Sequence, residues 1–146
     1  MRRLMILEFN RTLFDTSRGK LFADALRFLE TAKAVGFELV LVTRRLGFSR
    51  LSFENSGLRE IISEVRVVEG KTLELFAELA RRCDQPEQSF VIGDRMREEI
   101  RFGNLQGLST VLVRRGWFMK ETPAGAVEVP DYAVESLEEI VSFLSN

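Results

Sequence analysis

Two polar side chains lie at the end of the first apolar run of the sequence, at a spacing that suits chemistry. The strand expected over Leu4–Phe9 carries Glu8 near its end, and Asn10 follows directly. Alternation along a strand places Glu8 and Asn10 on the same side of the strand end. A carboxylate at the mouth of a buried strand is costly without a partner, so this position is the first candidate for a functional site.

Further reactive groups follow other apolar runs. Thr43 comes after the second expected strand, Asp94 follows Gly93 after the fourth, and Lys71 opens a helix after Gly70. In open α/β sheets, ligands bind beyond the carboxyl ends of the strands. An ammonium group and a helix N-terminus together hold anions, and carboxylates hold hard divalent cations. The set therefore suits a phosphate group accompanied by a divalent metal ion.

Strand and helix signals alternate along the chain, which indicates a parallel sheet with helices on both faces. We expect an α/β fold: a doubly wound three-layer sandwich with a central, mostly parallel five-stranded sheet, formed by residues 1–146 as a single core domain. The expected strands are Leu4–Phe9, Glu38–Val42, Val65–Val68, Ser89–Ile92 and Thr110–Val113. The expected helices are Leu21–Val35, Phe48–Ser56, Lys71–Arg82, Arg97–Leu105 and Leu137–Leu144, the last with Ser136 as N-cap and Glu139 at the capping-box position.

The composition excludes several classes of chemistry. The 146 residues include no His and a single Cys83, which removes Ser-His-Asp and Cys-His catalysis, most zinc sites and any internal disulfide. A net charge of −1 gives no indication of nucleic acid or an acidic membrane surface as a partner. The first residues resemble neither a signal peptide nor a membrane span, so we expect a cytoplasmic protein.

Four motifs in a fixed order carry a resemblance to a known family. They are Glu8-Phe9-Asn10-Arg11-Thr12, Thr43, Lys71, and Gly93-Asp94 with Glu99. The chain resembles the haloacid dehalogenase-like (HAD) phosphohydrolase superfamily, whose first motif is Asp-x-Asp-x-Thr. The resemblance covers almost the whole chain and leaves little room for a cap domain, so a capless core is expected.

The resemblance implies roles for six residues. Glu8 and Asn10 occupy the catalytic positions of nucleophile and acid/base; Thr43 and Lys71 would bind phosphate; Glu8, Asn10, Asp94 and Glu99 would hold Mg²⁺. In the family the nucleophile is an aspartate that forms a phosphoaspartyl intermediate.

The departures from the family pattern fall on the reactive pair. Glu8 is one methylene longer than the usual aspartate, and a misplacement of about 1 Å can cost on the order of a hundredfold in rate. Asn10 cannot exchange a proton as a carboxyl group does, a loss of about 10²–10⁴ in rate. The residues expected to bind phosphate and metal remain. The pattern is that of a binding site kept and a reactive pair lost.

Each candidate also has a purely structural interpretation. Glu8 can be an ordinary acid paired with Lys71, and Asn10 can tie down its turn. Asp94 is the hardest to explain structurally, because the strand before it is otherwise apolar. The pair Arg44-Arg45 either steers an anion or is solvated. The apolar loop Trp117–Met119 is a core, lid or interface segment.

Two functions are weighed. The first is a HAD-like protein that binds phosphate and a divalent metal, with weak or lost phosphatase activity; the second is an active Mg-dependent phosphatase with Glu8 as nucleophile. We expect the first. The partner is then a small phosphorylated molecule or a phosphoprotein, with no nucleic acid and no membrane, and capless relatives imply a homo-oligomer as an option. Motif order argues against a receiver domain, and the missing Gly-x-Gly-x-x-Gly argues against a dinucleotide enzyme.

Overall fold

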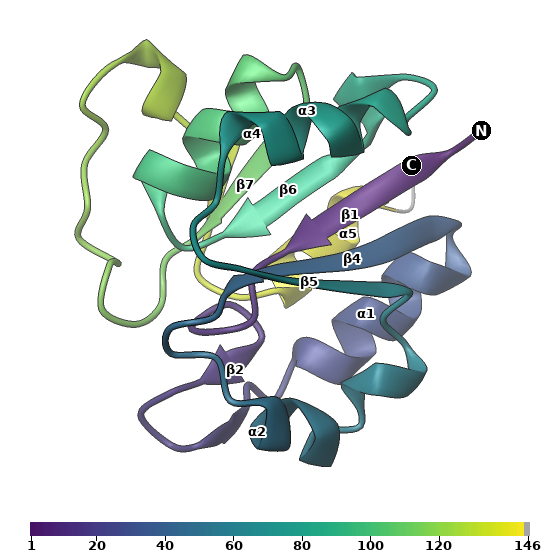
Figure 1. Ribbon diagram of the computed structural model, residues 1–146, viewed down its shortest axis with the longest axis vertical. Helices are drawn as coiled ribbons and strands as arrows, with labels where there is room; N and C mark the ends of the chain where they lie inside the picture. Colours follow the sequence, from purple (N-terminus) through teal and green to yellow (C-terminus); the bar gives the residue numbers. More distant parts are fainter. Residues whose placement is uncertain (145–146) are drawn as a thin grey trace.

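The computed structural model describes residues 1–144 and shows a parallel sheet covered on both faces by helices (Figure 1). The sheet has six strands in the order β5-β4-β1-β6-β7-β8, and each neighbouring pair is parallel. The strands are β1 (Arg3–Leu7), β4 (Phe37–Arg44), β5 (Glu64–Val68), β6 (Phe90–Gly93), β7 (Ser109–Val113) and β8 (Tyr132–Val134). This confirms the expected fold class, with one strand more than the five that the sequence predicts.

Residues 1–144 include five α-helices, of which four lie between strands and the last follows β8. They are α1 (Ala25–Ala34), α2 (Arg50–Asn55), α3 (Leu73–Arg81), α4 (Arg101–Leu105) and α5 (Glu138–Leu144). In Figure 1, α3 and α4 lie on one face of the sheet, while α1 and α2 lie on the other. A π-helical turn, Met96–Ile100, runs directly into α4. Within residues 1–144, no helix is long and apolar enough to cross a membrane.

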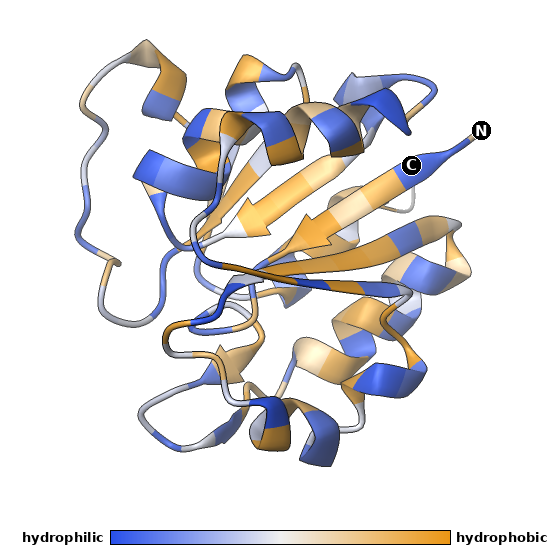
Figure 2. Ribbon diagram, viewed as in Figure 1, coloured by the Kyte–Doolittle hydropathy of each residue, from blue (hydrophilic) through white to orange (hydrophobic). Residues whose placement is uncertain are grey.

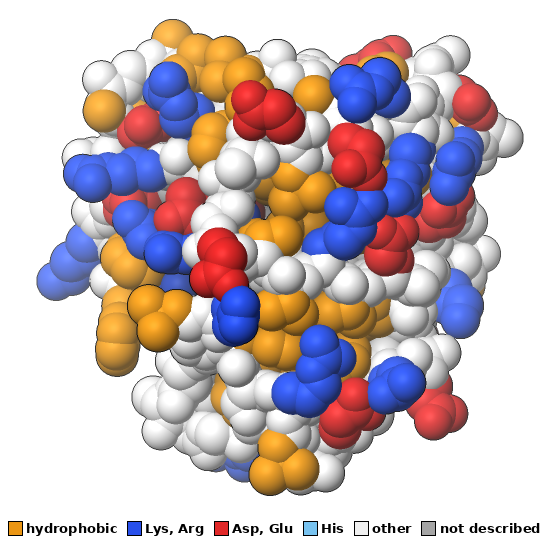
Figure 3. Space-filling model, in the orientation of Figure 1, with side chains coloured by type: hydrophobic (Ala, Val, Ile, Leu, Met, Phe, Trp, Pro, Cys, Tyr) orange, Lys and Arg blue, Asp and Glu red, His pale blue; other side chains and the backbone are white. Residues whose placement is uncertain are grey.

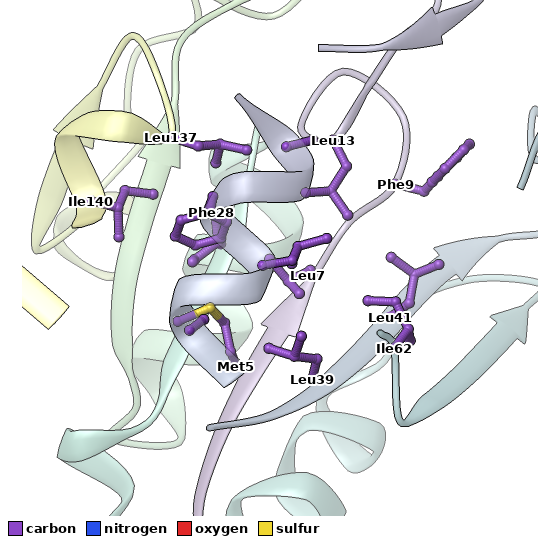
Figure 4. Packing of buried hydrophobic residues seen from close by; sticks show 14 of the residues in the cluster. Met5, Leu7, Phe9, Leu13, Phe28, Leu39, Leu41, Ile62, Leu137 and Ile140 are labelled. Atoms are coloured by element: carbon purple, nitrogen blue, oxygen red, sulfur yellow. The ribbon is translucent and has the colours of Figure 1, made fainter. Parts of the chain in front are cut away.

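The central strand explains why the two helical layers hold together. Met5 and Leu7 of β1 pack into the cluster on the α1 face, and Leu4 and Ile6 pack into the cluster on the α3 face. All four side chains are at most 1% exposed. Side chains of a strand point alternately to opposite faces, so an unbroken apolar run is what a strand buried on both sides requires. Figure 2 shows this apolar centre, and Figure 4 shows the packing of Met5 and Leu7 beside Phe28 of α1.

Several element bounds differ from the sequence expectation for local reasons. The first helix begins at Ala25, not at Leu21, because Lys20–Leu21 forms β3 and pairs antiparallel with β2 (Phe14–Asp15). The third helix begins after Lys71 because Thr72 is its N-cap, whose hydroxyl accepts a hydrogen bond from the Leu75 amide at 3.2 Å. The missed strand β8 is a three-residue edge strand, too short for alternation to reveal it.

The close approach of α4 to the sheet gives a test of this packing. A Cβ atom on Gly103 would lie 2.7 Å from Thr110 Cγ2 and 3.0 Å from Val91 Cγ2. The crowding at this position should outweigh the roughly 1 kcal/mol by which alanine is favoured over glycine inside a helix. Gly103→Ala should therefore destabilise the protein by about 1–3 kcal/mol. Urea unfolding measures the change. Gly125→Ala is the control, because nothing lies within 4 Å of its Cβ position; equal stability of the two variants would contradict the packing.

Candidate functional site

A cleft of about 360 Å³ opens at the carboxyl ends of the central strands. Its walls are formed by Glu8, Asn10, Arg11, Thr43, Arg44, Leu46, Gly47, Arg95, Glu98, Glu99, Trp117 and Phe118. Four of the predicted site residues are therefore in the wall. Lys71 and Asp94 lie behind it, each bonded to a wall residue. The structure thus brings the six predicted residues to one place, in two layers.

Glu8 has both carboxylate oxygens engaged within the protein. Oε1 accepts hydrogen bonds from the backbone amides of Phe9 at 2.7 Å and Asn10 at 3.3 Å. Oε2 forms an ion pair with Lys71. The chain leaves β1 at this point, and the Glu8 amide still bonds to the Ile92 carbonyl of β6 at 3.2 Å. The side chain therefore folds back onto its own turn and onto Lys71.

Lys71 is buried between two carboxylates. Its ammonium group bonds to Glu8 and to Glu99, and its side chain is 1% exposed. Burial alone would lower the pKa of Lys71, but the charges of Glu99 and Glu8 and their hydrogen bonds outweigh burial and raise this pKa above its ordinary value. Lys71 is thus a permanent cation whose charge is met by protein acids.

Glu99 reaches Lys71 from the π-helical turn after β6. Burial raises the pKa of Glu99 to about 7, and the opposing charge of Lys71 only partly offsets it, while the charges of Glu8 and Asp94 add to the rise. Gly93 makes room for this side chain, since a Cβ atom there would lie 2.6 Å from Glu99 Cγ. Two acids therefore share one ammonium group.

Asp94 is held by an arginine. Arg11 Nε donates to Asp94 Oδ2 at 2.5 Å, and Asp94 is 2% exposed. Burial raises the pKa of Asp94 against the effect of Arg11. Arg11 has a φ of 65°, unique among the non-glycine residues of the described chain, which fits a residue held in place by strong contacts. The second oxygen of Asp94 has no hydrogen-bond partner within residues 1–144.

Asn10 and Thr43 complete the inner wall. Asn10 Nδ2 donates to the Gly47 carbonyl at 2.9 Å, which joins the turn after β1 to the loop after β4. Thr43 is 1% exposed and lies in β4, opposite Val67 of β5. Asn10 therefore has the structural role that its residue type favours, while Thr43 remains a wall residue of the cleft.

The predicted magnesium ligands do not fit a metal ion in this arrangement. Each carboxylate of Glu8, Asp94 and Glu99 already bonds to Lys71 or Arg11. No group of three or more Asp, Glu, Cys or His residues in the described chain is arranged to hold a metal. Mg²⁺ demands near-octahedral oxygen coordination, which these committed carboxylates do not supply.

Arg11 and Arg95 line the site and were not predicted from the sequence, whereas Arg44 lines it as one member of the pair Arg44-Arg45 considered for steering an anion. Arg11 follows Asn10 directly, and its position beside the reactive pair was the available signal. Phe118 lies under the guanidinium groups of Arg11 and Arg95, at 4.9 and 3.7 Å from its ring centroid. Trp117 and Phe118 of the apolar loop therefore form a side wall of the cleft, with Trp117 79% exposed. On the face in Figure 3, acidic and basic side chains are interspersed.

Comparison with known proteins identifies the family of this chain. The family model described as HAD-hydrolase-like matches residues 69–140. A glyceraldehyde 3-phosphate phosphatase from Methanopyrus kandleri is 31% identical over 129 residues, which are 84% of this chain and 55% of that protein. The chain belongs to the haloacid dehalogenase-like superfamily. It spans about half the length of this curated relative.

Two solved structures share the fold at low identity. One is a D,D-heptose 1,7-bisphosphate phosphatase from B. bronchiseptica complexed with magnesium and phosphate, with a TM-score of 0.73 and 15% identity over 99% of this chain and 98% of that one. The other is a 2-haloacid dehalogenase from Pseudomonas syringae, with a TM-score of 0.76 and 14% identity over 99% of both chains. These likenesses establish the fold.

The buried lysine gives a stability test. Lys71→Met leaves Glu8 and Glu99 without their shared cation, and breaking a buried ion pair on one side typically costs about 3–5 kcal/mol. We expect a loss of that order in urea unfolding at pH 7, partly recovered when Glu99→Gln is added. Lys33→Met, at an exposed position of α1, is the matched control and should change stability little. A loss in Lys71→Met no larger than in the control would contradict the buried cluster.

The pKa of Glu99 gives a pH test. A carboxyl group with a pKa of about 7 when folded and 4.5 when exposed binds a proton more tightly in the folded state. Stability should therefore fall as the pH rises from about 4.5 to about 7, by on the order of 3 kcal/mol, and level off above that. The free energy of unfolding between pH 5 and pH 8 measures this slope. Glu99→Gln should flatten it; an unchanged slope would assign the effect to another group.

Proposed function

We propose that this chain is a phosphate-monoester-binding protein of the HAD phosphatase fold whose own hydrolytic activity is weak or lost. The engagement of Glu8 carries this proposal. A nucleophilic carboxylate must turn a free oxygen toward the phosphorus atom in line with the leaving group. Both oxygens of Glu8 instead bond to the protein, Oε1 to two backbone amides and Oε2 to Lys71.

Asn10 supports the same conclusion. An amide cannot protonate a leaving group or activate water, and the Nδ2 group of Asn10 is tied to the Gly47 carbonyl. The wall of the cleft offers no histidine in its place, because the chain has none. Both positions of the reactive pair are thus occupied by residues that hold the turn together.

The remaining cleft supports binding of a small phosphorylated molecule. Arg11, Arg44 and Arg95 line it together with Thr43. Glu98, also in the wall, pairs with Arg44 and Arg95, so Arg11 is the cation whose acid, Asp94, lies behind the wall. Guanidinium groups match the geometry of phosphate oxygens. A volume of about 360 Å³ lies at the small end of ligand sites, which favours a small phosphate monoester over a phosphoprotein. The donor set does not support Mg²⁺ as part of this site.

A second function is favoured by one observation. The 31% identity to a glyceraldehyde 3-phosphate phosphatase extends over 84% of this chain. It supports an active phosphatase in which Glu8 leaves Lys71 when a phosphate group arrives and attacks the phosphorus atom. The ester oxygen then leaves with a proton from water, and hydrolysis of the glutamyl phosphate restores the acid and releases phosphate. Between Glu8 and Thr43 the described chain holds only the β2–β3 hairpin, α1 and part of β4, which supports a core without a cap under either function.

A turnover assay distinguishes the two functions. We expect the native chain to hydrolyse glyceraldehyde 3-phosphate and p-nitrophenyl phosphate with kcat/KM below about 10² M⁻¹s⁻¹, against the roughly 10⁴–10⁸ M⁻¹s⁻¹ of ordinary enzymes. Glu8→Asp with Asn10→Asp should raise the rate at least about tenfold, because both reactive groups return. Phosphate release, with and without magnesium, is the measurement.

The control variant makes the same two substitutions at positions outside the cleft. Glu54→Asp with Asn55→Asp makes the identical pair of changes in α2 and should leave the rate unaltered. Calorimetric titration with glyceraldehyde 3-phosphate tests binding separately, and Thr43→Val should weaken it. Native turnover in the ordinary enzyme range would replace the first function by the second, and a native chain that neither binds nor hydrolyses either compound would defeat both.

A further inference from the structure

We propose that the Arg11 guanidinium takes the place of a divalent cation beside Asp94, so that the cleft binds a phosphate monoester without metal. The proposal rests on the proposed function in one respect, namely that the cleft takes a phosphate group. It assigns to Arg11 both the neutralisation of Asp94 and direct contact with the ligand. The contacts of Arg11 and the partners of the nearby carboxylates support it.

Arg11 already makes the contact that a cation would make. Its Nε group donates to Asp94 Oδ2 at 2.5 Å, and the acid is almost fully buried at 2% exposure. A guanidinium remains charged at every accessible pH and carries five N–H donors in a planar fork. One donor meets Asp94. The four N–H bonds of the two Nη groups remain, and Arg11 is part of the cleft wall.

The side chain of Arg11 is held in this position before any ligand arrives. Its stem packs against Gly116, where a Cβ atom would lie 3.2 Å from Arg11 Cγ. Its guanidinium lies 4.9 Å from the centroid of the Phe118 ring, and Arg95 lies over the same ring at 3.7 Å. A cation fixed in advance loses little freedom when it binds an anion. The backbone at Arg11, with φ of 65°, is consistent with such a fixed position.

The carboxylates around Arg11 offer few free oxygens as ligands for a metal ion. Both oxygens of Glu8 have partners, and one oxygen each of Asp94 and Glu99 is bonded to a cation. Among the oxygens of these three carboxylates, Asp94 Oδ1 and Glu99 Oε2 have no hydrogen-bond partner within residues 1–144. Mg²⁺ prefers six oxygens in an octahedron and would be repelled by the guanidinium at Asp94. Removal of Arg11 should therefore open the site to magnesium.

Calorimetric titration tests the proposal with two probes, MgCl₂ alone and glyceraldehyde 3-phosphate. We expect native protein to bind no Mg²⁺ at concentrations up to about 10 mM, a weak limit for a protein site. Its affinity for glyceraldehyde 3-phosphate should be the same within about twofold in EDTA and in excess magnesium, since the guanidinium supplies the cation. Arg11→Gln should lose at least about tenfold of that affinity in EDTA, and should gain both Mg²⁺ binding and dependence on magnesium.

Three further variants make the outcome specific. Arg11→Lys keeps the charge without the fork, so it should bind the phosphate ester with intermediate affinity. Arg11→Gln with Asp94→Asn removes the unpaired buried acid, which protects folding, and should lose phosphate affinity without gaining magnesium. Arg18→Gln, at an exposed position of the β2–β3 turn, is the matched control and should behave as native.

The two probes separate this proposal from the function on which it rests. Native protein that binds Mg²⁺ in the millimolar range, or whose affinity for the phosphate ester rises tenfold with magnesium, would overturn the proposal. So would an Arg11→Gln variant that binds the ester as native does. If native protein binds no ester under any condition, the proposed function fails, and with it the direct contact of Arg11 with the ligand. The MgCl₂ titration still decides whether Arg11 stands in the place of the metal.

Discussion

The structure depends on the neutralisation of three buried carboxylates at one edge of the sheet. Glu8 and Glu99 share the ammonium group of Lys71, and Asp94 is paired with Arg11. A buried charge without a partner is far more costly than an ordinary lost contact, so these five side chains fix one another. They come from the turn after β1, the loop before α3, the end of β6 and the π-helical turn. The cluster therefore also ties together the segments that form the cleft.

The length of the Glu8 side chain determines which groups its carboxylate can contact. An extra methylene lets the carboxylate fold back onto the amides of Phe9 and Asn10 while its other oxygen meets Lys71. Both carboxylate oxygens of Glu8 then bond to groups of the protein itself. Under the proposed function, the same geometry that stabilises the acid keeps its oxygens from a substrate, so the turn would be stabilised at the expense of nucleophilic attack.

The fold was largely predictable from the sequence, but the pairing of charges was not. Unbroken apolar runs such as Leu4–Leu7 fixed which strands are buried on both faces, and the strand ends placed the six candidate residues together. The short elements β8 and the β2–β3 hairpin were not predicted, because they have too few residues to show a periodic pattern of apolar side chains. Arg11 was not predicted for another reason. Its position next to Asn10 was a signal, but which acid it meets depends on side-chain reach and on a positive φ, which that position does not reveal.

The presence of Lys71 and Asp94, which match the family pattern, has two explanations. Lys71 and Asp94 are the residues that a phosphohydrolase would retain for chemistry, yet here each is required to balance charge that is already buried. Their presence alone is weak support for ligand binding, since burial would preserve them after function was lost. The stronger support comes from groups that face the cleft, Thr43 and the guanidinium of Arg11. Charge balance with Asp94 needs only one donor of Arg11, so the donors that remain beside the cleft are the feature that the proposed binding of a phosphate group would use.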